Sequence, residues 1–146
     1  MKTVSSNLIM QGIAIADAIA RRTGVTLDSV DDALTLRRAA LTLHRWYEGE
    51  CGGGNAYASW AIERDDTTGA PYRVTYPHNG KAYRTRIPDR EKGALKRIAA
   101  VCARYGLAYY VQTDPRGATL YVARPEDGMT DRNYSSVGVC VGVCVA

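Results

Sequence analysis

Pro71-Tyr-Arg-Val-Thr-Tyr-Pro-His-Asn-Gly-Lys-Ala-Tyr-Arg-Thr-Arg-Ile87 has the pattern of two strands joined by a tight turn. Asn79-Gly80 favours a type I′ turn, which needs positive φ at both central residues, so a β-hairpin is predicted here. A two-residue loop also fixes the register, and Arg73 is expected to face Arg86 across the hairpin. Arg73, Arg84 and Arg86 are thereby predicted to share one face.

Positive charge is concentrated in and just after this hairpin. Residues 72–97 contain eight Lys and Arg residues and two acidic residues, a formal charge of 8 − 2 = +6, whereas the whole chain carries +4. A concentrated cationic surface in a small protein usually faces a phosphate group, a nucleic acid or an acidic protein surface. The alternative is a solvated face on which the arginines pair with Glu63, Asp66 and Glu91.

A helix is predicted to continue the basic surface. Pro88-Asp89 indicates its start, and residues 90–105 have helical periodicity. Arginine, unlike lysine, suits bidentate recognition of phosphate or carboxylate groups, which favours anion binding over a solvated face. The predicted ligand-binding residues are Arg73, Arg84, Arg86, Arg90, Arg97 and Arg116, with Tyr83 or Tyr110 stacking on a base.

The remaining sequence predicts further helices and strands. Apolar spacing and end signals indicate two helices within residues 5–51, and Asp114-Pro-Arg-Gly117 indicates a second hairpin. The expected fold is α+β, in which an antiparallel sheet of five to six strands, made of two hairpins and a C-terminal strand, packs against three helices. One domain over residues 1–146 is expected, with a helical part at 5–51 and a sheet-plus-helix part at 56–146.

Residues 137–145 alternate valine with glycine and cysteine, which predicts the C-terminal strand. The strand is expected either at the centre of the sheet or at an edge, where it would pair with a second subunit, and its glycines would let a helix approach closely. In an extended strand the Cα atoms of Cys140 and Cys144 would be about 13 Å apart, too far for a disulfide. The four cysteines are therefore expected to be reduced.

The chain lacks the common nucleotide-loop, zinc-protease and serine-hydrolase motifs, so a protein that is not an enzyme and has no cofactor is expected. His44, Glu48 and Cys51 have the spacing of metal ligands or of a thiol and its base, but a surface pair and a cap-region thiol are the favoured interpretation. The apolar run at residues 8–20 is too short for a membrane span. A cytoplasmic protein is expected.

Four segments together resemble a family of small proteins of tailed phages and prophages. They are Arg45-Trp-Tyr-Glu-Gly-Glu-Cys51, Glu63-Arg-Asp-Asp-Thr-Thr-Gly-Ala-Pro-Tyr72, Ile87-Pro-Asp-Arg-Glu-Lys-Gly-Ala-Leu-Lys-Arg97 and Gln112-Thr-Asp-Pro-Arg-Gly117. The resemblance implies a phage origin. Phage proteins of this size without catalytic motifs include inhibitors of host defence.

Two kinds of inhibitor are similar in composition to this chain. One is the oligomeric sponge that sequesters cyclic or ADP-ribose-type nucleotide signals of Thoeris or CBASS systems, and the other is the anti-CRISPR protein that blocks nucleic acid or docks on a host defence complex. The sponge is favoured, because arginines suit phosphates, aromatic rings suit bases, and a DNA mimic would be acidic. A homo-oligomer is expected.

Overall fold

The computed structural model describes residues 6–51, 59–64, 67, 71–76, 80–114 and 117–143. Its elements, in chain order, are α1 (Ser6–Thr23), α2 (Val30–Cys51), β1 (Ser59–Arg64), β2 (Pro71–Tyr76), β3 (Tyr83–Thr85), α3 (Asp89–Tyr105), β4 (Ala108–Asp114), β5 (Gly117–Ala123), the 3₁₀ helix η1 (Pro125–Asp127), α4 (Tyr134–Val137) and β6 (Val139–Gly142). The predicted α+β class is confirmed.

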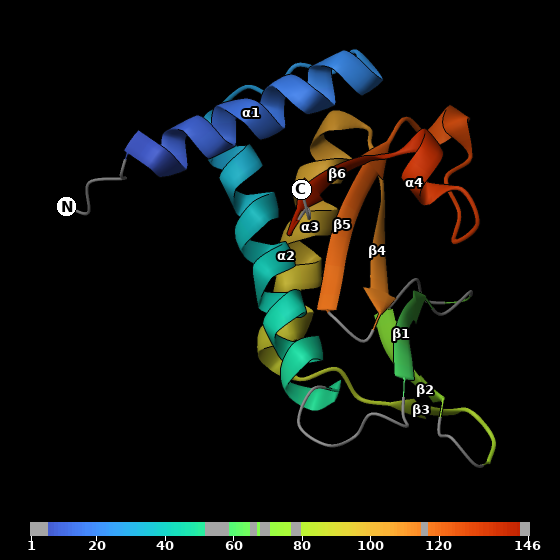
Figure 1. Ribbon diagram of the computed structural model, residues 1–146. Helices are drawn as coiled ribbons and strands as arrows, with labels where there is room; N and C mark the ends of the chain where they lie inside the picture. Colours follow the sequence, from blue (N-terminus) through green and yellow to red (C-terminus); the bar gives the residue numbers. More distant parts are fainter. Residues whose placement is uncertain are drawn as a thin grey trace.

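The described strands form two antiparallel sheets, with strand orders β1-β2-β3 and β4-β5-β6. The predicted single sheet of five to six strands is wrong. β1 contacts β4 but is not paired with it, and Figure 1 shows β1 at the end of β4 rather than alongside it. The two hairpins therefore share no ladder hydrogen bonds, and each sheet stops at three strands.

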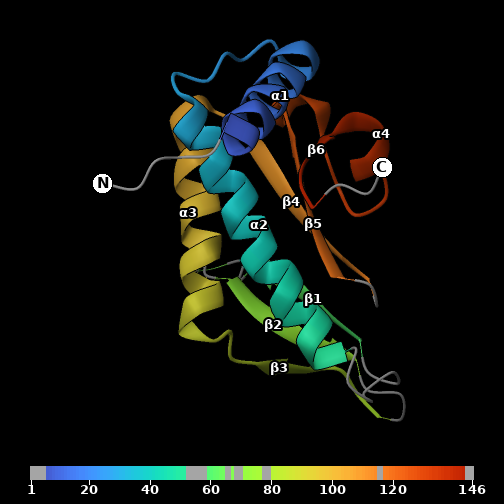
Figure 2. The ribbon, with the colours of Figure 1, turned by 60° about the vertical axis from the view of Figure 1, so that its left-hand side comes forward.

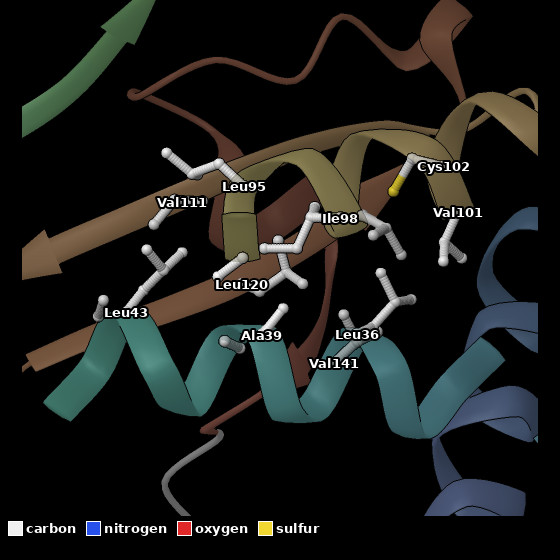
Figure 3. Packing of buried hydrophobic residues seen from close by; sticks show 14 of the residues in the cluster. Leu36, Ala39, Leu43, Leu95, Ile98, Val101, Cys102, Val111, Leu120 and Val141 are labelled. Carbon is white, nitrogen blue, oxygen red and sulfur yellow. The ribbon is translucent and has the colours of Figure 1, made fainter. Parts of the chain in front are cut away.

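The core lies between the helices and one face of the sheet β4-β5-β6. Figure 2 shows α2 and α3 side by side in front of this sheet, with β1-β2-β3 near the end of α2 and the start of α3. Leu36 and Leu43 of α2 point toward Ile98 of α3 and Leu120 of β5 (Figure 3), and none of these four side chains is accessible to solvent. Burial of each contributes about 1.5–3 kcal/mol to folding. The central strand β5 is thus the main support of the helical layer.

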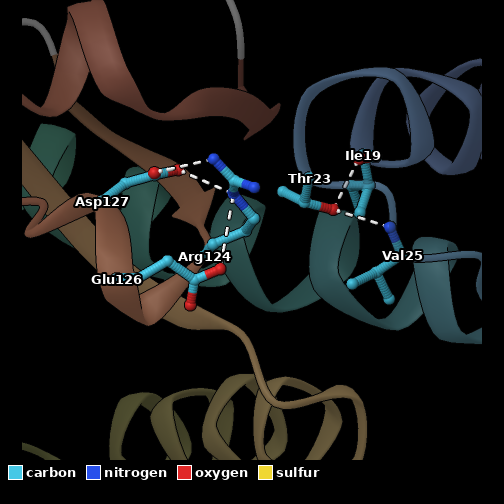
Figure 4. A network of polar contacts seen from close by, with 6 residues as sticks. All are labelled: Ile19, Thr23, Val25, Arg124, Glu126 and Asp127. Atoms are coloured by element: carbon cyan, nitrogen blue, oxygen red, sulfur yellow. Dashed lines mark hydrogen bonds and ion pairs between the residues drawn. The ribbon is translucent and has the colours of Figure 1, made fainter.

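Two loop ends are fixed by local polar contacts, shown in Figure 4. At the end of α1 the Thr23 hydroxyl donates to the Ile19 carbonyl (2.7 Å) and accepts from the Val25 N–H (3.1 Å). After β5 the Arg124 guanidinium donates to both carboxylate oxygens of Asp127, at 3.2 and 3.0 Å. The Thr23 contacts satisfy backbone groups where α1 stops, whereas Arg124 and Asp127 form a salt bridge between side chains.

The register of the first hairpin differs by one residue from the predicted one. Arg73 pairs with Thr85 and Val74 pairs with Arg84, whereas the two-residue turn would have placed Arg86 opposite Arg73. Residues opposite each other share a face of the sheet and neighbours along a strand alternate. Arg73 and Arg84 therefore lie on opposite faces, and the prediction of three arginines on one face is wrong. A shift of one residue in the pairing moves every side chain of β3 to the other face relative to those of β2.

The C-terminal strand is shorter than predicted, and it is an edge strand of β4-β5-β6. β6 ends at Gly142, and Val143 has a φ of 56°. The expectation of four reduced cysteines is wrong as well, because Cys140 is disulfide-bonded, while Cys102 is free and buried. The distance argument assumed an extended chain from Cys140 to Cys144, but the strand stops before Cys144, which lies outside the described residues.

A polar cluster joins the start of α2 to the end of α3. The mostly buried Asp32 carboxylate accepts hydrogen bonds from Arg104 (2.9 Å) and from the Tyr105 hydroxyl. The same hydroxyl accepts a bond from the Asp28 N–H at 2.9 Å. The bond to Asp32 is the main cause of a raised Tyr105 pKa, because the carboxylate stabilises the protonated phenol.

We predict that Tyr105→Phe weakens the alkaline loss of stability. Because the pKa of Tyr105 is raised in the folded protein, the unfolded chain releases the phenol proton first, near pH 10. The contribution of Tyr105 to the free energy of unfolding is therefore complete below pH 10, and it is lost as pH rises through the pKa of the folded state. Urea midpoints measured from pH 8 to pH 11 should fall less steeply in Tyr105→Phe than in the unaltered protein. Tyr83→Phe, at an exposed site, is the control and should keep the original slope. Equal slopes in all three proteins would contradict the prediction.

Candidate anion-binding site

A pocket of about 410 Å³ opens between the second half of α2 and the first turn of α3. It is lined by Arg38, Leu41, Thr42, Arg45 and Trp46 of α2 and by Arg90 and Glu91 of α3. The volume lies in the range of small-molecule sites, which is roughly 300–1,000 Å³. Three of its lining side chains are guanidinium groups, so an anion is the ligand that this pocket suits chemically.

The three arginines of the pocket are exposed at their ends and come from two helices. Arg38 and Arg45 are two turns apart on one face of α2, and Arg90 lies in the first turn of α3. Within the part of the chain that the structure describes, none of the three forms an ion pair. Their charges are therefore not neutralised by these neighbours, and an anionic ligand would meet all three.

The buried wall of the pocket combines an indole ring with a carboxylate. Trp46 is 9% exposed and Glu91 is 8% exposed. The Arg73 guanidinium lies 5.4 Å from the centre of the Trp46 ring, a cation–π contact that attaches β2 to the pocket wall. Arg73 thus supports the site through Trp46.

The first turn of α3 borders the site through Arg90 and Glu91. No side chain caps this helix at Pro88, and the first backbone bond that closes onto Pro88 comes from the Lys92 N–H (2.9 Å). N–H groups in the first turn of a helix have no partner within the helix, and they favour a negative charge in front of them. The pocket arginines and these donors act on an anion in the same direction.

The predicted arginines are only partly brought together. Arg90 lines the pocket and Arg73 contacts its wall, but Arg84 stacks on Tyr72 (3.6 Å from guanidinium carbon to ring centre), on the opposite face of the hairpin from Arg73. Arg86 pairs with Asp89 at 3.1 Å, in a solvent-exposed salt bridge of the kind that contributes little. Exposed Arg97 lies two turns beyond Arg90 on α3 and does not line the pocket.

The residues predicted to stack on a base do not line the pocket either. Tyr110 stacks on Tyr134 of α4, with ring centres 5.0 Å apart, and burial is the main cause of its raised pKa. Tyr83 is 52% exposed at the start of β3. Arg116 lies outside the described residues. Among the described lining residues, Trp46 supplies the aromatic ring of the site.

Sequence reasoning missed Arg38 and Arg45, which supply two of the three cations. Their spacing of seven residues, which puts both on one side of a helix, together with the adjacent Trp46, was the available signal. It was overlooked because the charge excess lies at residues 72–97.

The acidic residues that were expected to pair with the arginines are placed elsewhere. Glu63 accepts hydrogen bonds from the Tyr72 and Tyr76 hydroxyls, both at 3.2 Å. Asp66 lies outside the described residues.

His44 has a structural contact in the described part of the chain. Its Nδ1 lies 3.1 Å from both the backbone nitrogen and the carbonyl oxygen of Ala118, a contact that ties α2 to the start of β5 and in which the tautomer decides whether Nδ1 donates or accepts. The side chains of Glu48 and Cys51 lie outside those described, and no group of three metal-ligating side chains occurs among the described residues.

A second pocket, of about 360 Å³, lies between α1, α2 and β6. Its lining is mainly apolar, with Ile15, Leu41 and Val141 among the contributing side chains, and Arg37 is the one charged group among its described lining residues. It lacks the convergent cations of the pocket between α2 and α3. The latter is therefore the candidate functional site.

Comparison with models of known protein families, with curated proteins and with solved structures finds no match for this chain. In the described part of the chain, none of the helices has the length and apolar character that crossing a membrane requires. The assignment of a function therefore depends on the chemistry of the pocket.

Proposed function

We propose that this protein binds a phosphorylated small molecule, and specifically a nucleotide, in the pocket between α2 and α3. The observation that carries the proposal is the set of Arg38, Arg45 and Arg90 around one pocket, with no ion pair to any described residue. Guanidinium groups bind phosphate oxygens in pairs, and the first turn of α3, whose N–H groups favour a negative charge, borders the same pocket. The protein acts by binding rather than by catalysis.

The proposal extends to the biological role that the resemblance implies. A phage protein that holds a cyclic or ADP-ribose-type nucleotide signal would remove that signal from host immunity. A homo-oligomer in the host cytoplasm remains part of this hypothesis. The exposed apolar side chains of α1 support the homo-oligomer: Ile9, Met10 and Ile13 are 41%, 64% and 47% exposed. Such side chains on one helix suit contact with a second subunit.

A compact ligand is favoured over a polymer. The cations converge on one pocket of about 410 Å³, and the hairpin arginines are divided between two faces of their sheet. The alternative, in which the protein binds nucleic acid or docks on a host defence complex, would need a continuous basic track. The exposed line of Arg90 and Arg97 on α3 is the feature that favours it.

Calorimetric titration with inorganic pyrophosphate, AMP and a cyclic dinucleotide tests the proposal. Arg45→Ala and Arg90→Ala should each weaken binding by about tenfold or more, because a charge-assisted hydrogen bond contributes roughly 1.5–3 kcal/mol. Arg132→Ala is the matched control, since it removes the same charge from an exposed site before α4. It should leave binding unchanged.

Two outcomes would contradict the proposal. One is the absence of binding by all three ligands at millimolar concentration. The other is an equal loss of affinity in the control and in the pocket variants, which would indicate a general effect of net charge. Tight binding of an oligonucleotide without binding of the small ligands, with an affinity that falls steeply as salt rises, would support the nucleic-acid alternative instead.

A further inference from the structure

Glu91 lines the same pocket as the three arginines. It lies in the first turn of α3 and is 8% exposed. Its side chain has no hydrogen bond or ion pair with any residue that the structure describes. Among the described residues, Gln11 Oε1 is the one fully buried side-chain oxygen or nitrogen without a hydrogen-bond partner, so the Glu91 carboxylate oxygens keep contact with solvent although the residue as a whole is buried. The surrounding arginines do not pair with this carboxylate.

An acidic side chain in the first turn of a helix also interacts favourably with the helix dipole. Asp89 already occupies this turn, and its carboxylate is exposed and paired with Arg86. The dipole does not require a second acid that is buried and turned into a pocket. In an anion site Glu91 repels the ligand's phosphate, so its presence has a cost for binding unless another part of the ligand compensates for it.

From this arrangement we infer that Glu91 determines the specificity of the pocket by accepting hydrogen bonds from two adjacent donors on the ligand. The inference rests on the proposed function. The two carboxylate oxygens match a pair of neighbouring donors, and a nucleotide has two such pairs: the vicinal hydroxyls of a ribose, and the N1–H and N2–H groups of guanine. The arginines hold the phosphate end, while Glu91 selects the nucleoside end and disfavours simple anions.

Glu91→Gln separates this role from a structural one, because it predicts opposite changes for two kinds of ligand. The amide keeps the size of the side chain but loses one acceptor and the negative charge. Binding of a ligand with the donor pair should weaken by about tenfold. Binding of inorganic pyrophosphate should strengthen by about threefold, because a like charge is removed from the site. A loss of folding would change both affinities in the same direction.

AMP and 2′-deoxy-GMP identify the donor pair. AMP has the ribose hydroxyl pair but no N1–H, whereas 2′-deoxy-GMP has the guanine edge but lacks the 2′-hydroxyl. A selective loss of AMP binding in Glu91→Gln assigns the ribose hydroxyls, and a selective loss of 2′-deoxy-GMP binding assigns the guanine edge. Asp131→Asn, the same change of charge at an exposed site before α4, is the control and should alter none of these affinities.

The inference and the proposed function fail in different ways. If the unaltered protein does not bind pyrophosphate or either nucleotide, the proposed function is wrong. If these ligands bind but Glu91→Gln shifts all their affinities in one direction, or shifts none, the role of Glu91 is wrong and the anion site remains. Circular dichroism and the urea midpoint of Glu91→Gln confirm that the variant is folded.

Discussion

Gly142→Ala is expected to lower the free energy of unfolding by about 3 kcal/mol, the upper part of the range for added groups in a packed core. A Cβ at position 142 would lie 2.2 Å from the Ala40 Cβ. The Ala40 Cβ is fixed to the backbone of α2 and cannot rotate away, so α2 or β6 has to move. Gly142 of β6 pairs with Leu120 of β5 next to an irregularity in the register, and it faces α2 at Ala40.

A double-mutant cycle with Ala40→Gly checks this explanation. Ala40→Gly alone should cost about 1 kcal/mol, as glycine does within a helix. The loss of unfolding free energy in the double variant should be about 2 kcal/mol smaller than the sum of the losses in the two single variants. The reason is that the methyl group added at position 142 then occupies the space left by the methyl group of Ala40. Gly93→Ala in α3 is the control for the substitution itself. Its Cβ would meet only the flexible Arg97 side chain, at 3.4 Å, so it should stabilise the protein. Additive losses in urea unfolding would contradict the packing account.

Gly117→Ala is expected to have an effect of similar size for two separate reasons. The Cβ would lie 2.0 Å from the His44 Cε1, and Gly117 has a φ of 144°, which residues with a side chain rarely adopt. Backbone strain of this kind costs on the order of 1–3 kcal/mol. The ring of His44 cannot move freely, because its Nδ1 is hydrogen-bonded to the Ala118 backbone. Urea unfolding should show a total loss of about 3 kcal/mol or more.

His44→Ala separates the two contributions. In the double variant the steric conflict with the ring is absent, while the strain at position 117 remains. The loss caused by Gly117→Ala should therefore shrink in the His44→Ala background to about 1–3 kcal/mol. An unchanged loss would mean that the ring contact plays no part. A loss that disappears would mean that the backbone at this position tolerates a side chain.

The helices and the second hairpin could be predicted because their signals are local. Gly24 closes α1 with a φ of 76° and Gly106 closes α3 with a φ of 66°, both as expected for glycine after a helix. Asp114 pairs with Gly117, as the sequence between them indicated. Each of these signals acts within a few residues, so the neighbouring chain is enough to decide the outcome.

The positions of the arginines could not be predicted in the same way. In the observed pairing Arg73 is opposite Thr85 and contacts Trp46, while Arg84 lies on the other face. Alternation along a strand makes every side chain change faces when the pairing shifts by one. Thr75 is buried, so the face of β2 that it shares with Arg73 is the inner one. The face on which each arginine lies thus depends on the pairing of the strands and not on the turn residues alone.

The α+β class, the ends of the long helices and the excess of positive charge around residues 72–97 follow from the amino-acid sequence. The division of the strands into two sheets, and the meeting of Arg90 with Arg38 and Arg45 in one pocket beside Glu91, follow from the folded structure alone. Local turn and cap preferences depend on adjacent residues, whereas the pocket depends on two helices that are separated along the chain by the strands β1, β2 and β3. Their contact is fixed by the burial of apolar side chains in the shared core, a property of the whole fold.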